Sequence, residues 1–307
     1  MSLRGKIWSA LINFSMKRID NYDGSFLKVT TSEKSLSNSN FWKKFKNFNI
    51  TETFINSVKV IEFDPKNKKN ENIILYLHGG AYIACGPETH ASLVTQLSKY
   101  SGSKTIFPVY RLAPKHPFPA AVDDCLLVYK ELVAKGIKSE SISLIGDSAG
   151  GGLVMALLQI LYRDNIDLPS SAVLLSPWTD LTLSGDSITS RAERDPMLKA
   201  NKNIHNAIES YLNGEDPKNP LVSSIFCETF PTPPIQIHVG TEEIIYDDSV
   251  RIYEKLSENI NNKVTLRVWD GMFHVFNIFC KGFLAIPEAK KSNMEIANFI
   301  TENYPKK

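Results

Sequence analysis

The sequence contains few cysteines, and their arrangement suggests neither a metal site nor a set of disulfides. Cys85, Cys125, Cys227 and Cys280 are scattered along the 307 residues, with no CxxC pair and no histidine at ligand spacing. Disulfide scaffolds and zinc modules are therefore excluded, and we expect neither a metal nor a cofactor. Because unpaired cysteines are typical of a reducing compartment, we expect a cytoplasmic protein.

The chain also lacks an excess of charge of either sign. Its 35 basic and 33 acidic residues leave a formal net charge of +2. A charge so close to zero gives no general attraction to nucleic acids or anionic membranes, and no nucleic-acid-binding motif is present. We therefore expect a small or neutral partner and no nucleic acid. Hydrophobic residues make up 43% of the chain, which excludes disordered and collagen-like proteins.

No segment is apolar over the length that a transmembrane helix requires. The N-terminal segment MSLRGKIWSALINFSMKRID is interrupted by polar residues and has no small-residue cleavage site after it, so we interpret it as part of the mature protein. Its apolar residues recur at roughly helical spacing, namely Ile7, Trp8, Leu11, Ile12 and Phe14. This pattern predicts an amphipathic helix packed on the body, with binding at a lipid interface as the alternative and no stable membrane insertion.

Short β-branched runs alternate with longer helical patterns along the rest of the chain. We expect strands at 58–63, 73–77, 105–110, 141–145, 172–176, 235–239 and 264–269, and helices at 90–101, 119–134, 151–164, 247–259 and 287–302. The polar turn DPKNKKNEN predicts that the first two strands form an antiparallel hairpin. The later strands, with helices between them, are expected to be parallel. The long gap between Ser176 and Ile235 predicts an inserted lid.

The segment Gly146-Asp147-Ser148-Ala149-Gly150 follows an apolar strand pattern and precedes a helical one. A sharp strand-to-helix turn of this kind strains the serine backbone and lifts its Oγ clear of the sheet. Small residues are needed two before and two after the serine, because neighbouring backbone comes close. The segment therefore predicts that Ser148 is a nucleophile; a glycine-rich helix entry that binds phosphate is the alternative.

A serine nucleophile needs hydrogen-bond donors for the oxyanion that develops on its substrate. The loop His78-Gly79-Gly80-Ala81 directly follows the apolar run IILYL, so its amides can point into the site. We expect the amides of Gly79, Gly80 and Ala149 to form the oxyanion hole.

These motifs together resemble the hormone-sensitive-lipase family of α/β-hydrolases, which has an HGG-type loop upstream of a GDSAGG elbow. The resemblance extends to VYRLAPKHPFPAAVDDC, SPWTDLT and DGMFHVF, and covers roughly residues 58 to 280. The sequence departs from the family at Ala81, where a third glycine is usual, and at Lys115, where glutamate is usual.

The resemblance implies an α/β-hydrolase fold, with a mostly parallel central sheet, helices on both faces and a helical cap. It implies that residues 1–50 form the N-terminal part of the cap, and that residues 51–307 form the catalytic domain with a cap insertion at about 181–212. The implied partner is a small-molecule ester. A homodimer is left open.

Six histidines are candidates for the catalytic base. His274 lies after the last expected strand and after Ser148, which satisfies the order serine, acid, histidine of this fold. We therefore expect His274 to be the base. The other five are expected in roles outside catalysis: His78 in the oxyanion loop, His238 in the core, His205 on the lid surface, and His90 and His116 in the segments after earlier strands.

The catalytic acid is expected just beyond the strand IQIHV, where the segment GTEEIIYDD offers four carboxylates. The pattern of the family implies Glu243. Asp247 is expected to start the next helix, where an aspartate acts as a cap. Asp147 is expected to hold the elbow or the oxyanion loop rather than to titrate in catalysis.

The expected activity is that of a serine carboxylesterase with the triad Ser148, His274 and Glu243. By resemblance, its substrates are small, fairly apolar esters with short acyl chains. An amidase or a deacetylase could use the same triad, and a receptor on this fold would need no catalysis. The presence of His274 favours turnover over a receptor, because plant gibberellin receptors, which resemble the family, lack that histidine.

Overall fold

The computed structural model describes residues 1–19 and 39–305. Its centre is an eight-stranded sheet in the order β1-β2-β4-β3-β5-β6-β7-β8. The strands are β1 Phe48–Ile55, β2 Val58–Pro65, β3 Ile73–Leu77, β4 Lys104–Pro108, β5 Ile142–Asp147, β6 Ser171–Leu175, β7 Ile235–Gly240 and β8 Val264–Trp269. All neighbours from β4 to β8 are parallel, and β1 and β2 are antiparallel additions at one edge.

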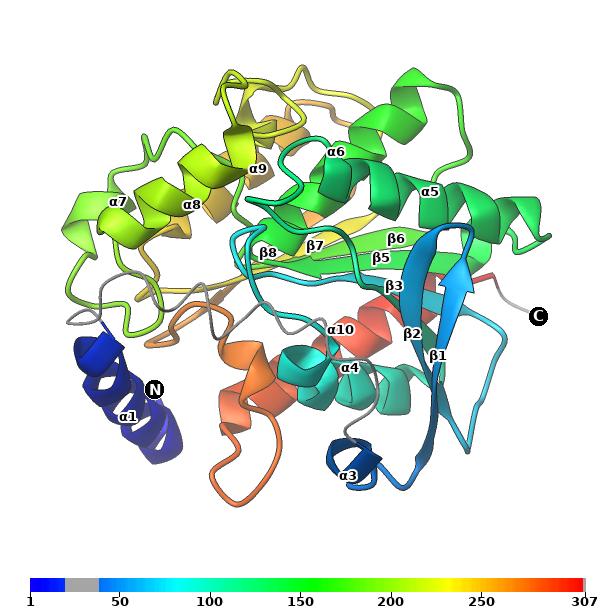
Figure 1. Cartoon of the computed structure of the whole chain (residues 1–307), viewed down its shortest axis with the longest axis horizontal. Coiled ribbons are helices and arrows are strands. Elements are labelled where there is room, and N and C mark those ends of the chain that lie inside the picture. The colour runs from blue at the N-terminus through cyan, green and yellow to red at the C-terminus, as the bar shows by residue number, and fades with distance from the viewer. Residues whose placement is uncertain (20–38, 306–307) are drawn as a thin grey trace.

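The central strands are covered on both faces, which explains their nearly unbroken apolar sequences. Every residue of β3, β5, β6 and β7 is buried. Figure 1 shows α4 and α10 on one side of the sheet, and α5, α6 and α9 on the other. These five helices are α4 Pro87–Ser101, α5 Ala120–Ala134, α6 Ala149–Arg163, α9 Tyr246–Ser257 and α10 Pro287–Asn303. The expected fold, an α/β-hydrolase sheet between two helical layers, is confirmed.

The expected hairpin between the first two predicted strands is wrong. Strand β2 pairs with β1 and β4, whereas β3 lies between β4 and β5 and is parallel to both. The polar connection therefore carries the chain past β4 instead of turning back beside β2. The uniform burial of IILYL is typical of a central parallel strand, whereas an edge hairpin strand alternates. Strand β1 was not predicted, and the boundary expected after residue 50 falls inside it.

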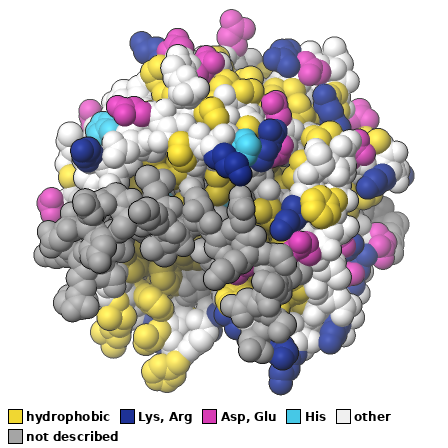
Figure 2. Space-filling model, in the orientation of Figure 1, with side chains coloured by type: hydrophobic (Ala, Val, Ile, Leu, Met, Phe, Trp, Pro, Cys, Tyr) yellow, Lys and Arg dark blue, Asp and Glu magenta, His cyan; other side chains and the backbone are white. Residues whose placement is uncertain are grey.

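The N-terminal helix α1, Leu3–Ile19, packs on the body as expected. The Trp8 ring lies 4.6 Å from that of Phe279, its Nε1 donates to the carbonyl of Leu284 at 2.8 Å, and Ile12 is buried in the same cluster. Leu3, Ile7 and Leu11 remain exposed on another face of α1. Figure 2 shows hydrophobic side chains gathered where α1 lies in Figure 1. No helix among the described residues is long and apolar enough to cross a membrane.

The remaining short elements lie mainly in loops and in the expected insertion. They are α3 Ser39–Trp42, η1 Ser139–Ser141, α7 Ser187–Ser190, α8 Lys202–Leu212, η2 Ser224–Phe226 and η3 Phe276–Ile278. Helices α7 and α8 lie beyond the carboxyl end of β6, on the same side of the molecule as the ends of the parallel strands (Figure 1). This edge is where α/β sheets place their ligand sites.

Candidate active site

Ser148 occupies the turn between β5 and α6. Its backbone has φ 51° and ψ −122°, a conformation that residues other than glycine rarely adopt. A Cβ on Gly146 would collide with the carbonyl of Gly150, and a Cβ on Gly150 would collide with the carbonyl of Leu77. The two glycines are therefore required by close backbone contacts, and they let the strained turn present Ser148 at the edge of the sheet.

The structure brings Ser148, His274 and Glu243 together in one hydrogen-bonded row. His274 Nε2 lies 2.9 Å from Ser148 Oγ, and His274 Nδ1 lies 3.1 Å from Glu243 Oε2. The serine follows β5, the glutamate follows β7 and the histidine follows β8, so all three meet at the carboxyl ends of parallel strands. Because a carboxylate only accepts, Nδ1 carries the proton donated to Glu243, and Nε2 is free to accept from the serine hydroxyl.

The surroundings of His274 favour its protonated form. Burial by itself lowers the pKa of His274, but the hydrogen bond and charge of Glu243 raise it, and the charges of Asp195 and Asp147 add to that effect. The pKa of His274 therefore lies above its ordinary value of 6.5. A histidine that readily takes a proton, held beside a serine hydroxyl, is suited to act as a general base.

Ser176, which directly follows β6, is a supporting residue that the sequence reasoning missed. Its Oγ donates to Glu243 Oε1 at 2.8 Å and accepts from the amide of Val275 at 3.1 Å. The amide of Gly240 donates to the same Glu243 oxygen at 2.5 Å. Ser176 thus connects the glutamate to the loop that carries His274. The motif SPWTDLT, which begins at Ser176, is part of the family resemblance, but nothing in the motif marks the serine as a partner of the acid.

Removing the Ser176 hydroxyl should weaken catalysis without weakening binding. In Ser176→Ala, Glu243 loses one donor and the histidine loop loses one anchor, so we expect kcat to fall about tenfold, the worth of roughly one hydrogen bond. KM and the melting temperature should change little. Steady-state kinetics and thermal unfolding of this variant, beside the exposed-helix control Ser257→Ala, test the role. A change in melting temperature with kcat intact would make Ser176 merely structural.

Asp147 holds the loop that follows β3, as expected. Its buried carboxylate accepts from the Tyr76 hydroxyl at 2.7 Å and from the amide of Gly79 at 3.1 Å, and lies 3.2 Å from His90 Nε2. Burial raises the pKa of Asp147, but the charge and hydrogen bond of His90 and the hydrogen bond of Tyr76 outweigh that effect and hold the pKa below its ordinary value. The assignment of Gly79 to the oxyanion hole is therefore wrong, because the buried carboxylate needs donors and already uses that amide.

The neighbouring amides remain available. Among the described residues, the amides of Gly80, Ala81 and Ala149 have no protein acceptor. Gly80 has φ 118° and Ala81 φ 53°, so the chain turns sharply here, and the carbonyl of Gly80 accepts from the amide of Ala84 at 3.0 Å. Two expected donors, Gly80 and Ala149, therefore keep amides without a protein acceptor, and the amide of Ala81 is a third; Gly79, which precedes Gly80, lies against Ser148.

The other histidines have structural surroundings. His78 stacks between Phe107 and Tyr110, and burial lowers its pKa to about 3. Burial likewise lowers the pKa of His238, inside β7, to about 3. The expected loop role of His78 and core role of His238 are confirmed. The other three are placed as follows: His90 is buried in α4 beside Asp147, His205 is exposed on α8, and His116 is half-buried in a loop.

Asp247 lies in the first turn of α9, but its carboxylate does not cap that helix. Residue Ile245 is the N-cap, and Asp247 Oδ2 instead accepts from the amide of Ser187 in α7 at 2.8 Å. The next carboxylate, Asp248, accepts from the amides of Thr179 and Asp180, and burial raises its pKa to about 8. Asp247 therefore holds α7 of the inserted segment against the first turn of α9, while Glu243 faces His274.

An aromatic stack joins the insertion to the oxyanion loop. The ring of Tyr82 lies 3.8 Å from that of Tyr211 in α8, and Phe118 meets Tyr211 edge-on at 5.9 Å. Tyr82 was not singled out from the sequence, because an aromatic is core by default. Trp178 and Phe273 are almost fully buried and belong to the core. The stack holds α8 against Tyr82, and Ser148 is only 7% exposed.

Comparison with known proteins identifies the family of this chain. The family described as alpha/beta hydrolase fold matches residues 74–278. An acetyl-hydrolase of Streptomyces hygroscopicus and an esterase of Acinetobacter venetianus are each 36% identical over 230 residues, which covers 75% of this chain and 75% and 74% of theirs. A solved esterase from the bacterial hormone-sensitive lipase family superposes with a TM-score of 0.84 at 27% identity, over 99% of both chains. The chain therefore belongs to the hormone-sensitive-lipase family of α/β-hydrolases and is a carboxylic ester hydrolase.

Proposed function

We propose that the protein is a serine carboxylesterase that hydrolyses small esters through an acyl-enzyme on Ser148. The observation that carries the proposal is the buried row Ser148–His274–Glu243, with both ring nitrogens of the histidine in hydrogen-bond contact. A buried row of nucleophile, base and orienting acid is the arrangement that acyl transfer requires.

In the proposed reaction, Ser148 Oγ attacks the ester carbonyl while His274 Nε2 accepts its proton. The charge of Glu243 stabilises the imidazolium that forms, and the imidazolium returns the proton to the leaving alcohol. The amides of Gly80, Ala81 and Ala149 donate to the oxyanion. A water molecule, activated by His274, then releases the acid and restores the serine. Every proton in this sequence passes through His274 Nε2, which exchanges it with the serine, the leaving alcohol or the water.

The proposed substrates have short acyl chains. We propose that α1 and the insertion of about residues 181–212 form a cap, since α8 packs on Tyr82 and α1 packs on the segment after His274. The low exposure of Ser148 supports limited space around the nucleophile, and the name acetyl-hydrolase of one relative supports a short acyl group. Extra methylenes increase kcat/KM only while there is cavity for them to fill.

A panel of p-nitrophenyl esters from acetyl to palmitoyl tests the proposal. We expect kcat/KM to be highest for acetyl or butyryl and to fall for longer chains. An equivalent anilide and an acetylated sugar, measured in parallel, should turn over far more slowly. A kcat/KM that kept rising to palmitoyl in well-dispersed substrate would contradict the closed pocket. Preference for the anilide or the sugar would replace the esterase with an amidase or a deacetylase, and binding without turnover would indicate a receptor.

A further inference from the structure

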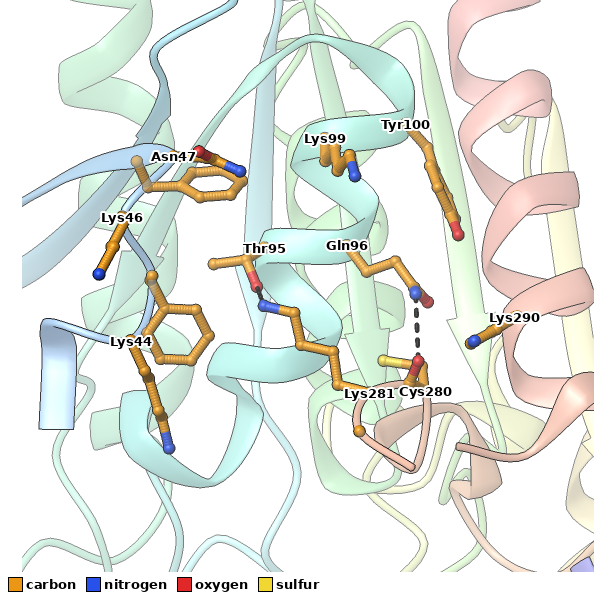
Figure 3. Close-up of a pocket in the computed structure, with 13 residues that line it drawn as sticks. Lys44, Lys46, Asn47, Thr95, Gln96, Lys99, Tyr100, Cys280, Lys281 and Lys290 are labelled. Carbon is orange, nitrogen blue, oxygen red and sulfur yellow. Dashed lines mark hydrogen bonds between the residues drawn. The ribbon is translucent and has the colours of Figure 1, made fainter. Parts of the chain in front are cut away.

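A lysine-lined hollow lies apart from the triad, between α4, the start of β1, the 280–282 loop and α10. Its volume is about 330 Å³. The cationic residues of its wall come from four parts of the chain: Lys44, Lys46, Lys99, Lys281 and Lys290. In Figure 3, Lys99, Lys281 and Lys290 lie around Thr95 and Gln96 of α4, whereas the side chains of Lys44 and Lys46 extend outward at the rim. None of the lining residues belongs to the triad or to the oxyanion loop, so the proposed esterase mechanism does not use this hollow.

The positive charge of the hollow is not balanced by the protein. No aspartate or glutamate is among the described residues that line it. None of its ammonium groups forms a salt bridge within the described part of the chain, whereas Lys104 pairs with Glu62 at 2.7 Å and Lys59 with Glu52 at 3.3 Å. Because the whole chain carries a net charge of only +2, this concentration of lysines is a local feature.

Two contacts show that the lysine at the centre of the wall is held in place. Lys281 Nζ donates to Thr95 Oγ1 at 3.1 Å and lies 4.3 Å from the centroid of the Phe45 ring, a cation–π contact. The loop that carries Lys281 is anchored to α4, because Gln96 Nε2 donates to the carbonyl of Cys280 at 3.3 Å (Figure 3). The side-chain Nδ2 of Asn293 donates in turn to Gln96 Oε1 at 2.7 Å.

The charges of two neighbouring lysines act on Lys281. Burial lowers the pKa of Lys281, Cys280 opposes this effect, and the charges of Lys44 and Lys99 lower the pKa further. Like charges gathered without a counter-charge repel one another, and an anion placed between them would relieve that repulsion. The hollow therefore has the electrostatic character of an anion site.

The residue types of the hollow suit phosphate. All of the cationic residues among the described residues that line it are lysines, which bind phosphate as point charges and need no planar fork. Lysine is a compact, strongly hydrated charge that suits phosphate oxygens. We propose that this hollow binds a ligand carrying two or more phosphate groups, since its volume exceeds the needs of a single phosphate. A soluble polyphosphate compound and the head groups of an anionic phospholipid surface share this chemistry, and experiment can separate them.

Calorimetric titration with sodium triphosphate at low ionic strength tests the proposal. We expect one site per chain, with affinity that falls as sodium chloride is added, because salt screens exposed charges. The double variant Lys99→Gln/Lys281→Gln should bind triphosphate about tenfold or more weakly, the loss of two charge-assisted contacts. The matched control Lys135→Gln/Lys263→Gln removes the same charge from exposed lysines elsewhere and should bind like the parent.

Co-sedimentation with vesicles identifies the source of the phosphate. A lipid head group is indicated if vesicles of phosphatidylglycerol retain the parent but not the Lys99→Gln/Lys281→Gln variant. Triphosphate should then release the parent from the vesicles. Triphosphate binding without retention on these vesicles would indicate a soluble ligand. The proposal is overturned if the parent binds neither probe at low salt, or if the hollow variant and the control variant lose binding equally, which would show a general charge effect. Ester hydrolysis by both double variants should match the parent and so show that each is folded.

Discussion

Replacing Ser148 with alanine should lower kcat by a factor on the order of a million and abolish labelling by a fluorophosphonate. Without its hydroxyl no acyl-enzyme can form, and residues of a triad act as a unit, so loss of the nucleophile removes the contribution of the whole row. The residual rate should reflect only binding and the oxyanion amides. Labelling should be specific, because among the serines that the structure describes, only Ser148 has its Oγ in contact with a histidine that is itself held by a carboxylate.

Two controls make this result interpretable. Thermal unfolding should show that Ser148→Ala folds, since the smaller side chain adopts the same strained turn and Gly146 and Gly150 are unchanged. The control Ser257→Ala, on the exposed end of α9, should keep the parent rate and the label. If the probe still labelled Ser148→Ala at the parent rate, the reactive serine would lie elsewhere and the elbow assignment would be lost.

The residues of the site were predictable where local backbone geometry requires them. Gly146 and Gly150 are needed because neighbouring backbone lies where their Cβ atoms would be. The spacing of the two glycines around Ser148 therefore has a physical cause. His274 followed from chain order, since the carboxyl ends of parallel strands meet at one edge. The structure places its ring between Ser148 and Glu243, as the sequence predicted.

The errors arise from contacts between segments that are distant in the chain. Gly79 was assigned to the oxyanion hole because glycine amides are accessible, but a carboxylate from the elbow takes that amide. Ser176 serves Glu243 across a span of 67 residues, and no local pattern marks it. The order of β2, β4 and β3 was missed for a related reason: hairpin signals describe the turn, whereas pairing depends on which strand needs burial on both faces.

Replacing Glu243 with glutamine should lower kcat by a factor on the order of a thousand or more, with KM and stability little changed. The amide oxygen of glutamine can still accept from the Ser176 hydroxyl and the amide of Gly240, so the side chain keeps its place. Its NH₂ group would then face His274 Nδ1 and act as a donor. This favours the tautomer with the proton on Nε2, which cannot accept from Ser148, and it removes the charge that stabilises the imidazolium.

Asp247→Asn is the matched control, because it makes the same chemical change four residues away. Asparagine retains an oxygen that can accept from the amide of Ser187, so the insertion stays attached to the first turn of α9. The kcat should therefore remain within about tenfold of the parent. Both variants are compared with one short-chain ester, and the loss in Glu243→Gln should appear in kcat, since the acid acts after substrate binds. A large loss of kcat confined to Asp247→Asn would transfer the role of acid to Asp247. It would also require the loop after β7 to rearrange before catalysis, because in the structure the carboxylate facing the histidine is that of Glu243.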